Sequence, residues 1–442
     1  MKAFSGEKQY IKNILVRDKI YFKKEDVVED FEHFKSKFIH KQVNDYYSTL
    51  IEYNDGVCSL PSNGWWMLKW DNLIDERNYP HRDKLTFNAT LRDYQKDAPP
   101  QFLETKNGIA RSGLLQAQCS WGKTFVGTYL ITQVQTKTLV MVHTKLLFRQ
   151  WEEELYKQTN VTKVGLVGDG IFDPQDITIG IYKSVSNNAK ELQDKFGFIL
   201  VDEAHRCPAK TFSEALNNLN ARIKSGMTAT PFRLDGKHGL LPEYFTPFKV
   251  IGKEPPRVNT VYYNIHETPY DFTYLDPKRD RARALSKLAS NLNYIEYIAS
   301  LAVQDIRSNR CILILSERLE MLKLLNKIIP KSILLVGGTD EDKRSEILNN
   351  AGIKYDVILS TTLFDEGISC HRIDTIYLTC PTSNLYKQEQ RIGRIIREHP
   401  DKQEPLVRDF WLKGSKIKGQ QEKRLNWYVK QGFKKWNQKI LL

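Results

Sequence analysis

The sequence predicts an α/β protein in which a small α+β domain precedes two parallel-sheet domains. Two stretches, Leu91 to about Val250 and Cys311 to about Leu412, alternate short apolar strands with segments of helical period. Such alternation is typical of a parallel sheet that helices cover on both faces. The first 88 residues lack it, and a chain of 442 residues has room for about three domains of ordinary size.

The first 88 residues are expected to form an accessory domain. We predict a strand at Tyr10–Phe22, a helix at Val27–Phe38 and a hairpin at Leu50–Leu60 that turns at Asn54-Asp55-Gly56. Three tryptophans follow the hairpin: Trp65, Trp66 and Trp70. They either stack on bases or pack in a core or interface, and packing is the favoured interpretation.

Residues 89–252 and 253–412 are expected to form the two parallel-sheet domains, with a linker indicated by Pro255-Pro256. In the first, we predict strands at Thr138–Val142, Ile177–Ile181, Phe198–Val201 and Ile223–Thr228, and helices at Leu146–Gln158 and Thr211–Leu219. In the second, we predict a long helix at Lys278–Arg307 and strands at Cys311–Leu315, Ile333–Val336, Val357–Ser360 and Thr375–Leu378.

The positive charge is concentrated at the C-terminal end. The formal net charge is +13, yet residues 1–88 are neutral, whereas residues 413–442 hold nine basic side chains against Glu422 alone. Aromatic residues interleave with these charges, a composition that suits a phosphate backbone and exposed bases. An amphipathic helix that docks its aromatics and leaves its lysines in water explains the same pattern, so both interpretations stay open. The aromatics are Trp427, Tyr428, Phe433 and Trp436.

The composition argues against several classes of protein. Six scattered cysteines without a CxxC pair argue against structural zinc and a disulfide framework, and fit a reducing cytoplasm. The longest apolar runs have the length of strands, and the N-terminal segment has no apolar region of a signal peptide. We therefore expect a cytoplasmic protein without membrane association.

The segment from Ala117 to Thr124 has the pattern of a phosphate cradle. Its residues are Ala117, Gln118, Cys119, Ser120, Trp121, Gly122, Lys123 and Thr124, with Ala117 in place of the usual first glycine. In such a loop, backbone N–H groups wrap the phosphates, the lysine meets β- and γ-phosphate oxygens, and the threonine hydroxyl holds Mg²⁺. The predicted strand before it and helix after it are the required context, and the cofactors expected are ATP and Mg²⁺.

Two further groups complete this chemistry. Asp202 and Glu203 follow a predicted strand, where Asp202 is placed to hold Mg²⁺ and Glu203 to deprotonate the attacking water. Arg394 and Arg397 lie three residues apart and share one face of a helix, so they could clamp a γ-phosphate from the second domain.

The ordered set of motifs over about Leu91 to Leu412 resembles the superfamily 2 helicases. Leu91-Arg92-Asp93-Tyr94-Gln95 is similar to the adenine-recognition element, and Asp202-Glu203-Ala204-His205 to the DEAH box. Gly226 to Pro231, Ser360 to Ile368 and Gln390 to Arg397 are similar to later motifs of the family. The resemblance implies two tandem RecA-like domains, with Gln95 as base reader, Gly367 in the nucleotide site and Gln390 near the γ-phosphate. It also implies nucleic-acid contacts at hydroxyl residues whose alternative role is that of loop caps: Thr144, Ser184, Ser316 and Thr361.

The sequence departs from the family pattern in places that remove no catalytic group. His143 stands where motif Ia usually has proline, Ser369 where motif V usually has Asp or Asn, and Ile396 where motif VI usually ends in glycine. The short chain and the residues of motifs III and V resemble the branch that includes the phage helicase UvsW, the RecG enzymes and the XPB-type helicases.

The resemblance implies an ATP-dependent DNA helicase or translocase that unwinds or branch-migrates DNA. Its expected substrate is forked, branched or partly single-stranded DNA in recombination, replication or repair, where proteins of those processes would be partners. A phage origin would place it in the host cytoplasm. The alternatives are an RNA helicase of the same superfamily and a nucleic-acid-binding scaffold without catalysis.

Overall fold

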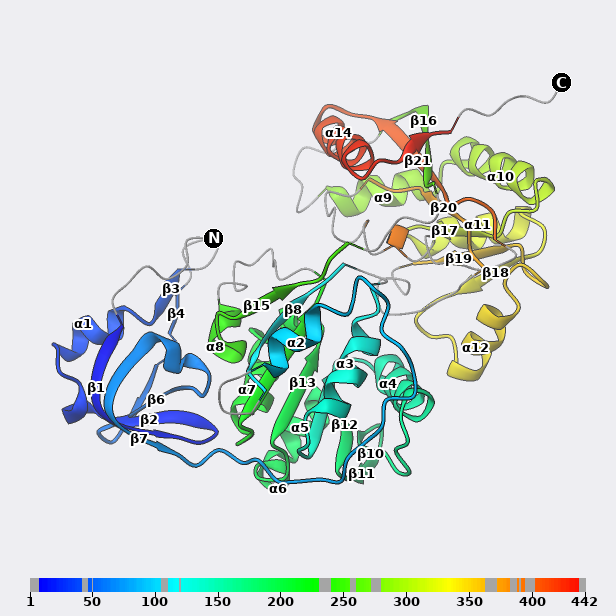
Figure 1. The fold of residues 1–442 in the computed structure, drawn as a ribbon. Helices are drawn as coiled ribbons and strands as arrows, with labels where there is room; N and C mark the ends of the chain where they lie inside the picture. The colour runs from blue at the N-terminus through cyan, green and yellow to red at the C-terminus, as the bar shows by residue number, and fades with distance from the viewer. Residues whose placement is uncertain are drawn as a thin grey trace. The chain divides into compact units, whose positions relative to one another are not determined.

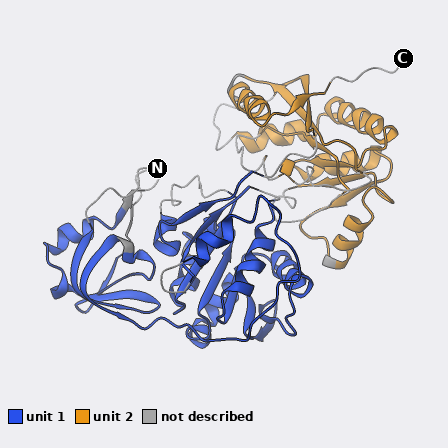
Figure 2. Ribbon diagram, in the orientation of Figure 1, with its two compact units in different colours: residues 1–255 blue, residues 256–442 orange. Residues whose placement is uncertain are grey.

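The computed structural model divides into two compact units, residues 1–255 and 256–442 (Figure 2). It describes residues 8–41, 47–49, 51–104, 110–118, 121–229, 240–254, 260–271, 280–361, 372–381, 388, 391–393 and 402–436. The expectation of parallel-sheet domains is confirmed, because each unit contains a large sheet of mainly parallel strands.

The first unit begins with a small sheet of strand order β5-β6-β2-β1-β7 (Figure 1). The expected single strand at Tyr10–Phe22 is wrong: β1 and β2 pair as an antiparallel hairpin, because the alternation of side chains continues across the turn at Asp18. The hairpin at Asn54-Asp55-Gly56 is confirmed, with Asp55 and Gly56 in the left-handed conformation that such turns require. The elements are β1 Gln9–Val16, β2 Lys19–Lys23, α1 Phe31–Ser36, β3 Ile39–Lys41, β4 Tyr47–Thr49, β5 Glu52–Asn54, β6 Val57–Pro61 and β7 Leu68–Asp75.

The expected helix at Val27–Phe38 is shorter in the structure. It begins after Asp30, whose side chain accepts a hydrogen bond from the backbone N–H of His33, as an N-cap residue does. Trp70 packs against the core of the small sheet, as expected, whereas Trp65 is exposed.

The second part of the first unit is a sheet of strand order β11-β10-β12-β9-β13-β14-β8-β15. The described strands pair in parallel except for β10 and β11. The strands are β8 Gly113–Gln116, β9 Thr138–Val142, β10 Gly165–Gly168, β11 Ile171–Asp173, β12 Ile177–Ile181, β13 Phe198–Asp202, β14 Ile223–Thr228 and β15 Lys249–Ile251. The helices are α2 Ala98–Leu103, α3 Lys123–Gln133, α4 Lys145–Gln158, α5 Tyr182–Asn187, α6 Ala189–Leu192, α7 Lys210–Asn217 and α8 Leu241–Phe245.

Helices cover both faces of this sheet (Figure 1). Alternate residues of a strand point to opposite faces, so Val140 and Leu200 join a core with α3 and α4, whereas Leu139 and Ile199 join a core with α5 and α7. The second core also contains the small N-terminal sheet. The two parts are joined by hydrogen bonds as well, since Lys224 Nζ donates to Ser62 Oγ at 2.8 Å and Asn63 Nδ2 donates to the carbonyl of Tyr244 at 2.6 Å.

The second unit contains a parallel sheet of strand order β18-β19-β17-β20-β21-β16-β22. The expected long helix at Lys278–Arg307 is instead two helices over its described part, because Asn291 interrupts it and caps the second helix by accepting from the N–H of Tyr294 at 3.1 Å. The elements are β16 Tyr262–Asp271, α9 Arg281–Ala289, α10 Leu292–Arg307, β17 Ile312–Leu315, α11 Leu319–Ile328, β18 Ser332–Leu335, α12 Glu341–Asn349, β19 Val357–Ser360, β20 Thr375–Leu378, β21 Leu406–Lys413, α14 Ser415–Lys430 and β22 Lys434–Lys435.

The basic C-terminal segment packs onto the second unit over its described part. Arg424 of α14 is 1% exposed and binds both carboxylate oxygens of Asp409 at 2.8 Å, and Tyr428 donates to the same carboxylate at 2.9 Å. β22 pairs with β16, and Trp436 packs against Tyr262. Docking therefore accounts for these aromatics, while the lysines of α14 that can be described remain exposed.

Among the described helices, none combines the length and the apolar character needed to cross a bilayer.

Candidate nucleotide site and nucleic-acid interface

Three neighbouring strands of the first unit end at the candidate nucleotide site. β14 lies between β13 and β8, and all three run in parallel, so their carboxyl ends meet at one edge of the sheet. Asp202 ends β13, Thr228 ends β14, and the phosphate cradle follows Gln116 of β8. The carboxyl edge of such a sheet is where this kind of fold binds ligands.

The cradle leads directly into α3. Gly122 adopts the left-handed conformation (φ 87°), which glycine reaches at little cost, and Lys123 is the first helical residue. Lys123 Nζ donates to the carbonyls of Ala117 and Gln118 at 3.2 and 3.3 Å, so its ammonium lies over the loop. The free N–H groups of the first turn add their dipole, which makes this helix end suited to phosphate.

Asp202 and Glu203 occupy different electrostatic environments. Asp202 accepts from Trp151 Nε1 at 3.0 Å and from the Glu203 N–H at 2.9 Å, while burial and the neighbouring carboxylate raise its pKa. Burial alone would raise the pKa of Glu203 too, but the hydrogen bond with His205 and the charge of Lys123 outweigh it and lower that pKa. Glu203 is therefore ionised at neutral pH and can accept a proton.

His205 joins this carboxylate to the neighbouring strand. Its Nδ1 lies 3.2 Å from Glu203 Oε2 and 3.1 Å from Thr228 Oγ1. The carbonyl of Thr228 accepts from the N–H of Ala117 at 3.1 Å. The cradle, the acidic pair and the end of β14 thus form one hydrogen-bonded group.

Gln95 contacts the cradle rather than open space. It is 1% exposed; its Nε2 donates to the carbonyl of Trp121 at 2.8 Å, and its Oε1 accepts from the N–H of Arg92 at 3.0 Å. The predicted role of base reader would require these bonds to exchange, and it stays a prediction.

The donor set fits ATP with Mg²⁺. A Mg²⁺ ion bound with a nucleotide needs one or two protein oxygens in addition to phosphate. Thr124, in the first turn of α3, and Asp202 offer such oxygens, and the described residues include no group of three or more His, Cys, Asp or Glu that could hold a metal on its own. Together with Lys123, these residues match a magnesium triphosphate better than an ion bound by protein alone.

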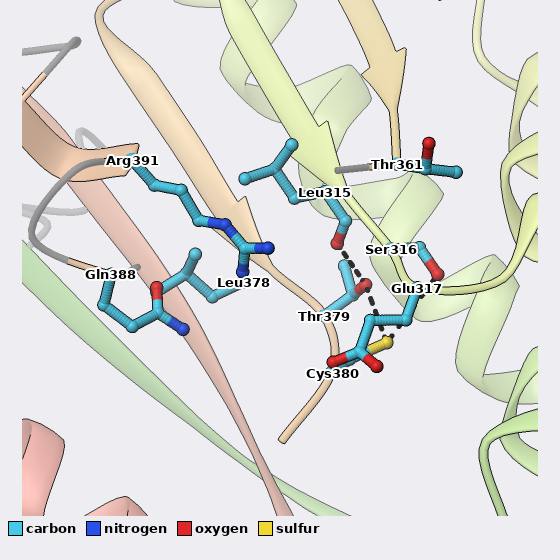
Figure 3. A pocket seen from close by; sticks show the side chains of 9 residues that line it. All are labelled: Leu315, Ser316, Glu317, Thr361, Leu378, Thr379, Cys380, Gln388 and Arg391. Carbon is cyan, nitrogen blue, oxygen red and sulfur yellow. Dashed lines mark hydrogen bonds between the residues drawn. The ribbon is translucent and has the colours of Figure 1, made fainter. Parts of the chain in front are cut away.

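A pocket lies at the carboxyl edge of the sheet in the second unit (Figure 3). Ser316 and Glu317 follow β17, Thr361 follows β19, and Cys380 follows β20. Figure 3 shows the side chains of Gln388 and Arg391 reaching in from the opposite side. Gln388 is 1% exposed, and both atoms of its carboxamide lack a hydrogen-bond partner in the described structure.

The four hydroxyl residues expected at nucleic acid have different surroundings. Thr144 caps α4, because its Oγ1 accepts from the N–H of Leu147 at 3.2 Å. Ser316 Oγ accepts from the N–H of Arg318 at 3.1 Å, which is the role of a loop cap. Ser184 lies in α5, and Thr361 lines the pocket of the second unit.

Several predicted site residues lie outside the described part of the chain: Cys119, Ser120, Gly367, Gln390, Arg394 and Arg397. Sequence reasoning also overlooked several residues that the structure brings to the two sites. Trp151 could be recognised as a core residue from the helical period of α4, but not as the donor to Asp202. Gln388 stands two residues before Gln390, and the family pattern directed attention to Gln390 alone.

Comparison with known families agrees with this arrangement. Residues 88–233 match the model of the type III restriction enzyme res subunit, and residues 293–399 match the helicase conserved C-terminal domain. Together these matches span more than half of the chain. Two RecA-like domains carrying a phosphate cradle and an acidic pair define a nucleotide-driven motor. The chain belongs to the superfamily 2 helicases and is an ATP-dependent enzyme of that group.

Individual relatives are similar over most of their length. The chain is 28% identical to the DNA 3'-5' translocase XPB2 of Sulfurisphaera tokodaii, covering 76% of this chain and 84% of the relative. It is 25% identical to a probable helicase of Escherichia phage T5, covering 95% of each. A putative ATP-dependent RNA helicase of Acanthamoeba polyphaga mimivirus is 24% identical, covering 81% of this chain and 71% of the relative.

Solved structures show the same fold at low sequence identity. S. cerevisiae Dbp5 bound to RNA and ADP BeF3 aligns with a TM-score of 0.57 at 14% identity, covering 78% of this chain and 89% of that one. The Hef helicase domain of Pyrococcus furiosus aligns with a TM-score of 0.52 at 14% identity, covering 75% and 98%.

Proposed function

We propose that this chain is an ATP-driven DNA helicase or translocase that unwinds or branch-migrates forked and junction DNA. The observation that carries the proposal is the juxtaposition of Lys123, the Asp202–Glu203 pair and His205 at one sheet edge, within a chain that carries both helicase domains. A UvsW-like or RecG-like preference for branched DNA is the finer part of the proposal, and it rests on the sequence resemblance.

The residues of the first unit have distinct roles in this proposal. Bound Mg²⁺ would neutralise charge on the triphosphate, with Thr124 and Asp202 as its protein contacts. Lys123 Nζ exchanges its two carbonyl acceptors for phosphate oxygens. Glu203, kept ionised by His205 and Lys123, accepts a proton from the attacking water. Arg394 and Arg397 supply positive charge to the transferred phosphate from the second domain, as the sequence predicts.

The XPB-type and phage relatives lead us to favour DNA over RNA. The translocase from Sulfurisphaera carries DNA in its name, and the similarity to the phage helicase extends over the N-terminal sheet. The name of the mimivirus relative instead favours RNA, so an RNA helicase is the second candidate. The pocket beside Thr361 and Gln388 is our candidate for the contact with the strand in the second unit.

A strand-displacement panel tests the proposal. The substrates are a simple fork, a replication fork, a four-way junction and an RNA–DNA hybrid, each with ATP or a non-hydrolysable analogue, while ATP turnover is measured alongside. We expect ATP-dependent displacement of the branched DNA substrates and stronger stimulation of turnover by forked DNA than by single-stranded RNA. The reverse order would support the RNA helicase. No turnover with any nucleic acid would support the scaffold.

The substitution Lys123→Ala tests the assigned ATP site. It removes the ammonium that neutralises phosphate charge, so ATP turnover should fall by about two orders of magnitude or more. Turnover that survives this substitution unchanged would contradict the assigned site.

A further inference from the structure

Trp121 lies within the phosphate cradle, although the proposed chemistry makes no use of its side chain. The residue is 0% exposed. Its ring faces Gly252 so closely that a Cβ atom added to Gly252 would lie 2.8 Å from Cε2. Its Nε1 donates to the carbonyl of Lys253 at 2.7 Å. Trp121 therefore connects the cradle to the last residues of the first unit.

Other contacts hold the same segments together. Gln95 Nε2 donates to the carbonyl of Trp121, and the ring of Tyr94 packs edge-on at 5.9 Å between centroids. Lys253 forms an ion pair with Asp97. The N–H of Gly252 donates to the carbonyl of Gln116 at 2.8 Å, next to the start of the cradle. The adenine-recognition segment, the cradle and residues 252–253 thus share one packed cluster within the first unit.

This cluster lies close to the point where the chain leaves the first unit. The chain passes from the first unit to the second at residues 255–256, two residues after Lys253. A densely packed side chain cannot move without displacing its neighbours. A displacement of the cradle on phosphate binding would therefore reach residues 252–253 through the indole.

We propose that Trp121 is a positioning residue that couples the nucleotide state of the cradle to the connection between the two units. This inference rests on the proposed function, because it assumes that ATP occupies the cradle and that nucleic acid binds with contributions from the second unit. The coupling is reciprocal: if nucleotide changes the affinity for DNA by some factor, DNA changes the affinity for nucleotide by the same factor.

The test measures that factor directly. The Kd for a fluorescent single-stranded DNA is determined by anisotropy with and without a non-hydrolysable ATP analogue and Mg²⁺, and the ratio of the two values is the coupling. In the unaltered chain we expect a ratio of about 5 to 150, the usual range for coupled sites. Trp121→Phe removes the N–H donor but retains an aromatic ring, and Gly252→Ala pushes a methyl group against that ring. Both variants should bring the ratio several-fold closer to one.

Gly419→Ala is the matched control, because a Cβ atom at Gly419 meets nothing within 4 Å. It should keep the unaltered ratio. A purely structural role of Trp121 would lower the midpoint of urea unfolding but leave the ratio of the folded variants unchanged, and that result overturns the inference. Trp121→Phe decides the question if it folds, and Gly252→Ala, whose added methyl group also meets Ala117 Cβ, tests the same contact from the other side. ATP turnover that responds to no nucleic acid in the unaltered chain would instead refute the proposed function itself.

Discussion

Gln388 buries a carboxamide that finds no hydrogen-bond partner in the described structure. Its neighbours in the pocket satisfy one another instead: Thr379 Oγ1 donates to the carbonyl of Leu315 at 2.7 Å, and Glu317 is paired with Arg281. An orphaned buried polar group costs free energy and calls for an explanation, and binding of a ligand is one. The donor and acceptor of this side chain suit the edges or backbone of a nucleic-acid strand.

Replacing Gln388 by leucine separates a structural role from a binding role. The leucine side chain has a similar volume and no polar atoms to leave unpaired, so the free energy of unfolding should stay the same or rise by about 1–3 kcal/mol. If the pocket receives the strand, Gln388→Leu should weaken single-stranded DNA binding several-fold in anisotropy titrations. Higher stability with unchanged affinity would remove the pocket from the nucleic-acid interface.

Lys224 places an ammonium group in the interface between the N-terminal sheet and the first helicase domain. Burial lowers the pKa of Lys224 to about 7, although the negative charge of Asp18 acts to raise it. Unfolding exposes the amine and returns its pKa to the ordinary value of about 10.4. Between these two values the unfolded chain binds one proton more than the folded chain, so this group makes the free energy of unfolding rise with pH.

Lys224→Met should abolish this contribution. Relative to the variant, the unaltered chain should gain up to about 1.4 kcal/mol of unfolding free energy per pH unit above pH 7, and nothing below it. Urea titrations at pH 6, 7, 8 and 9 measure the difference between the two chains. A difference that stays constant across this range would show that Lys224 remains protonated in the folded state.

At the scale of elements, α14 is held by an ion pair that water barely reaches. Asp409 is 0% exposed, and Arg424 is its bidentate partner. Arg424→Met removes the cation and leaves the carboxylate buried, which should lower the unfolding free energy of the second unit by about 3–5 kcal/mol. The adjacent Lys423 is exposed, so Lys423→Met should change it by less than about 0.5 kcal/mol. Equal effects of the two substitutions in urea unfolding would contradict the packing of α14.

Elements built from local apolar runs could be predicted from the sequence. β9, β12, β19 and β20 have the predicted bounds because each is a short apolar run between polar segments, and β14 has them although Lys224 and Ser225 interrupt its apolar residues. The β1–β2 hairpin could not be predicted, since the turn at Asp18 does not disturb the alternation. The same distinction applies to the site. Lys123, Asp202 and Glu203 could be predicted from the spacing of their motifs. The contacts of Trp121 with Lys253, 132 residues away, and of Trp151 with Asp202 depend on the tertiary fold.

At the scale of the whole molecule, the excess of positive charge has a defined location. Tyr428 and Phe433 are buried by the packing of the C-terminal segment onto the second unit, so they cannot stack on bases. Lys418, Lys423 and Lys430 of α14 remain exposed. This surface is therefore suited to phosphates alone, through contacts that depend on salt and not on base identity. Deleting residues 413–442 would not test it, because the deletion also removes Arg424 and β22 from the fold.

Point substitutions test the surface without unfolding the domain. If these lysines contact the strand, replacing Lys418, Lys423 and Lys430 by glutamine should lower the slope of log K against log salt by about 0.7 for each lost phosphate contact. Three matched, exposed lysines of the first unit serve as the control: Lys157, Lys190 and Lys195. Anisotropy titrations of single-stranded DNA at several salt concentrations give both slopes. A slope that falls equally in the two triple variants would indicate a diffuse effect of net charge and would assign α14 to docking only.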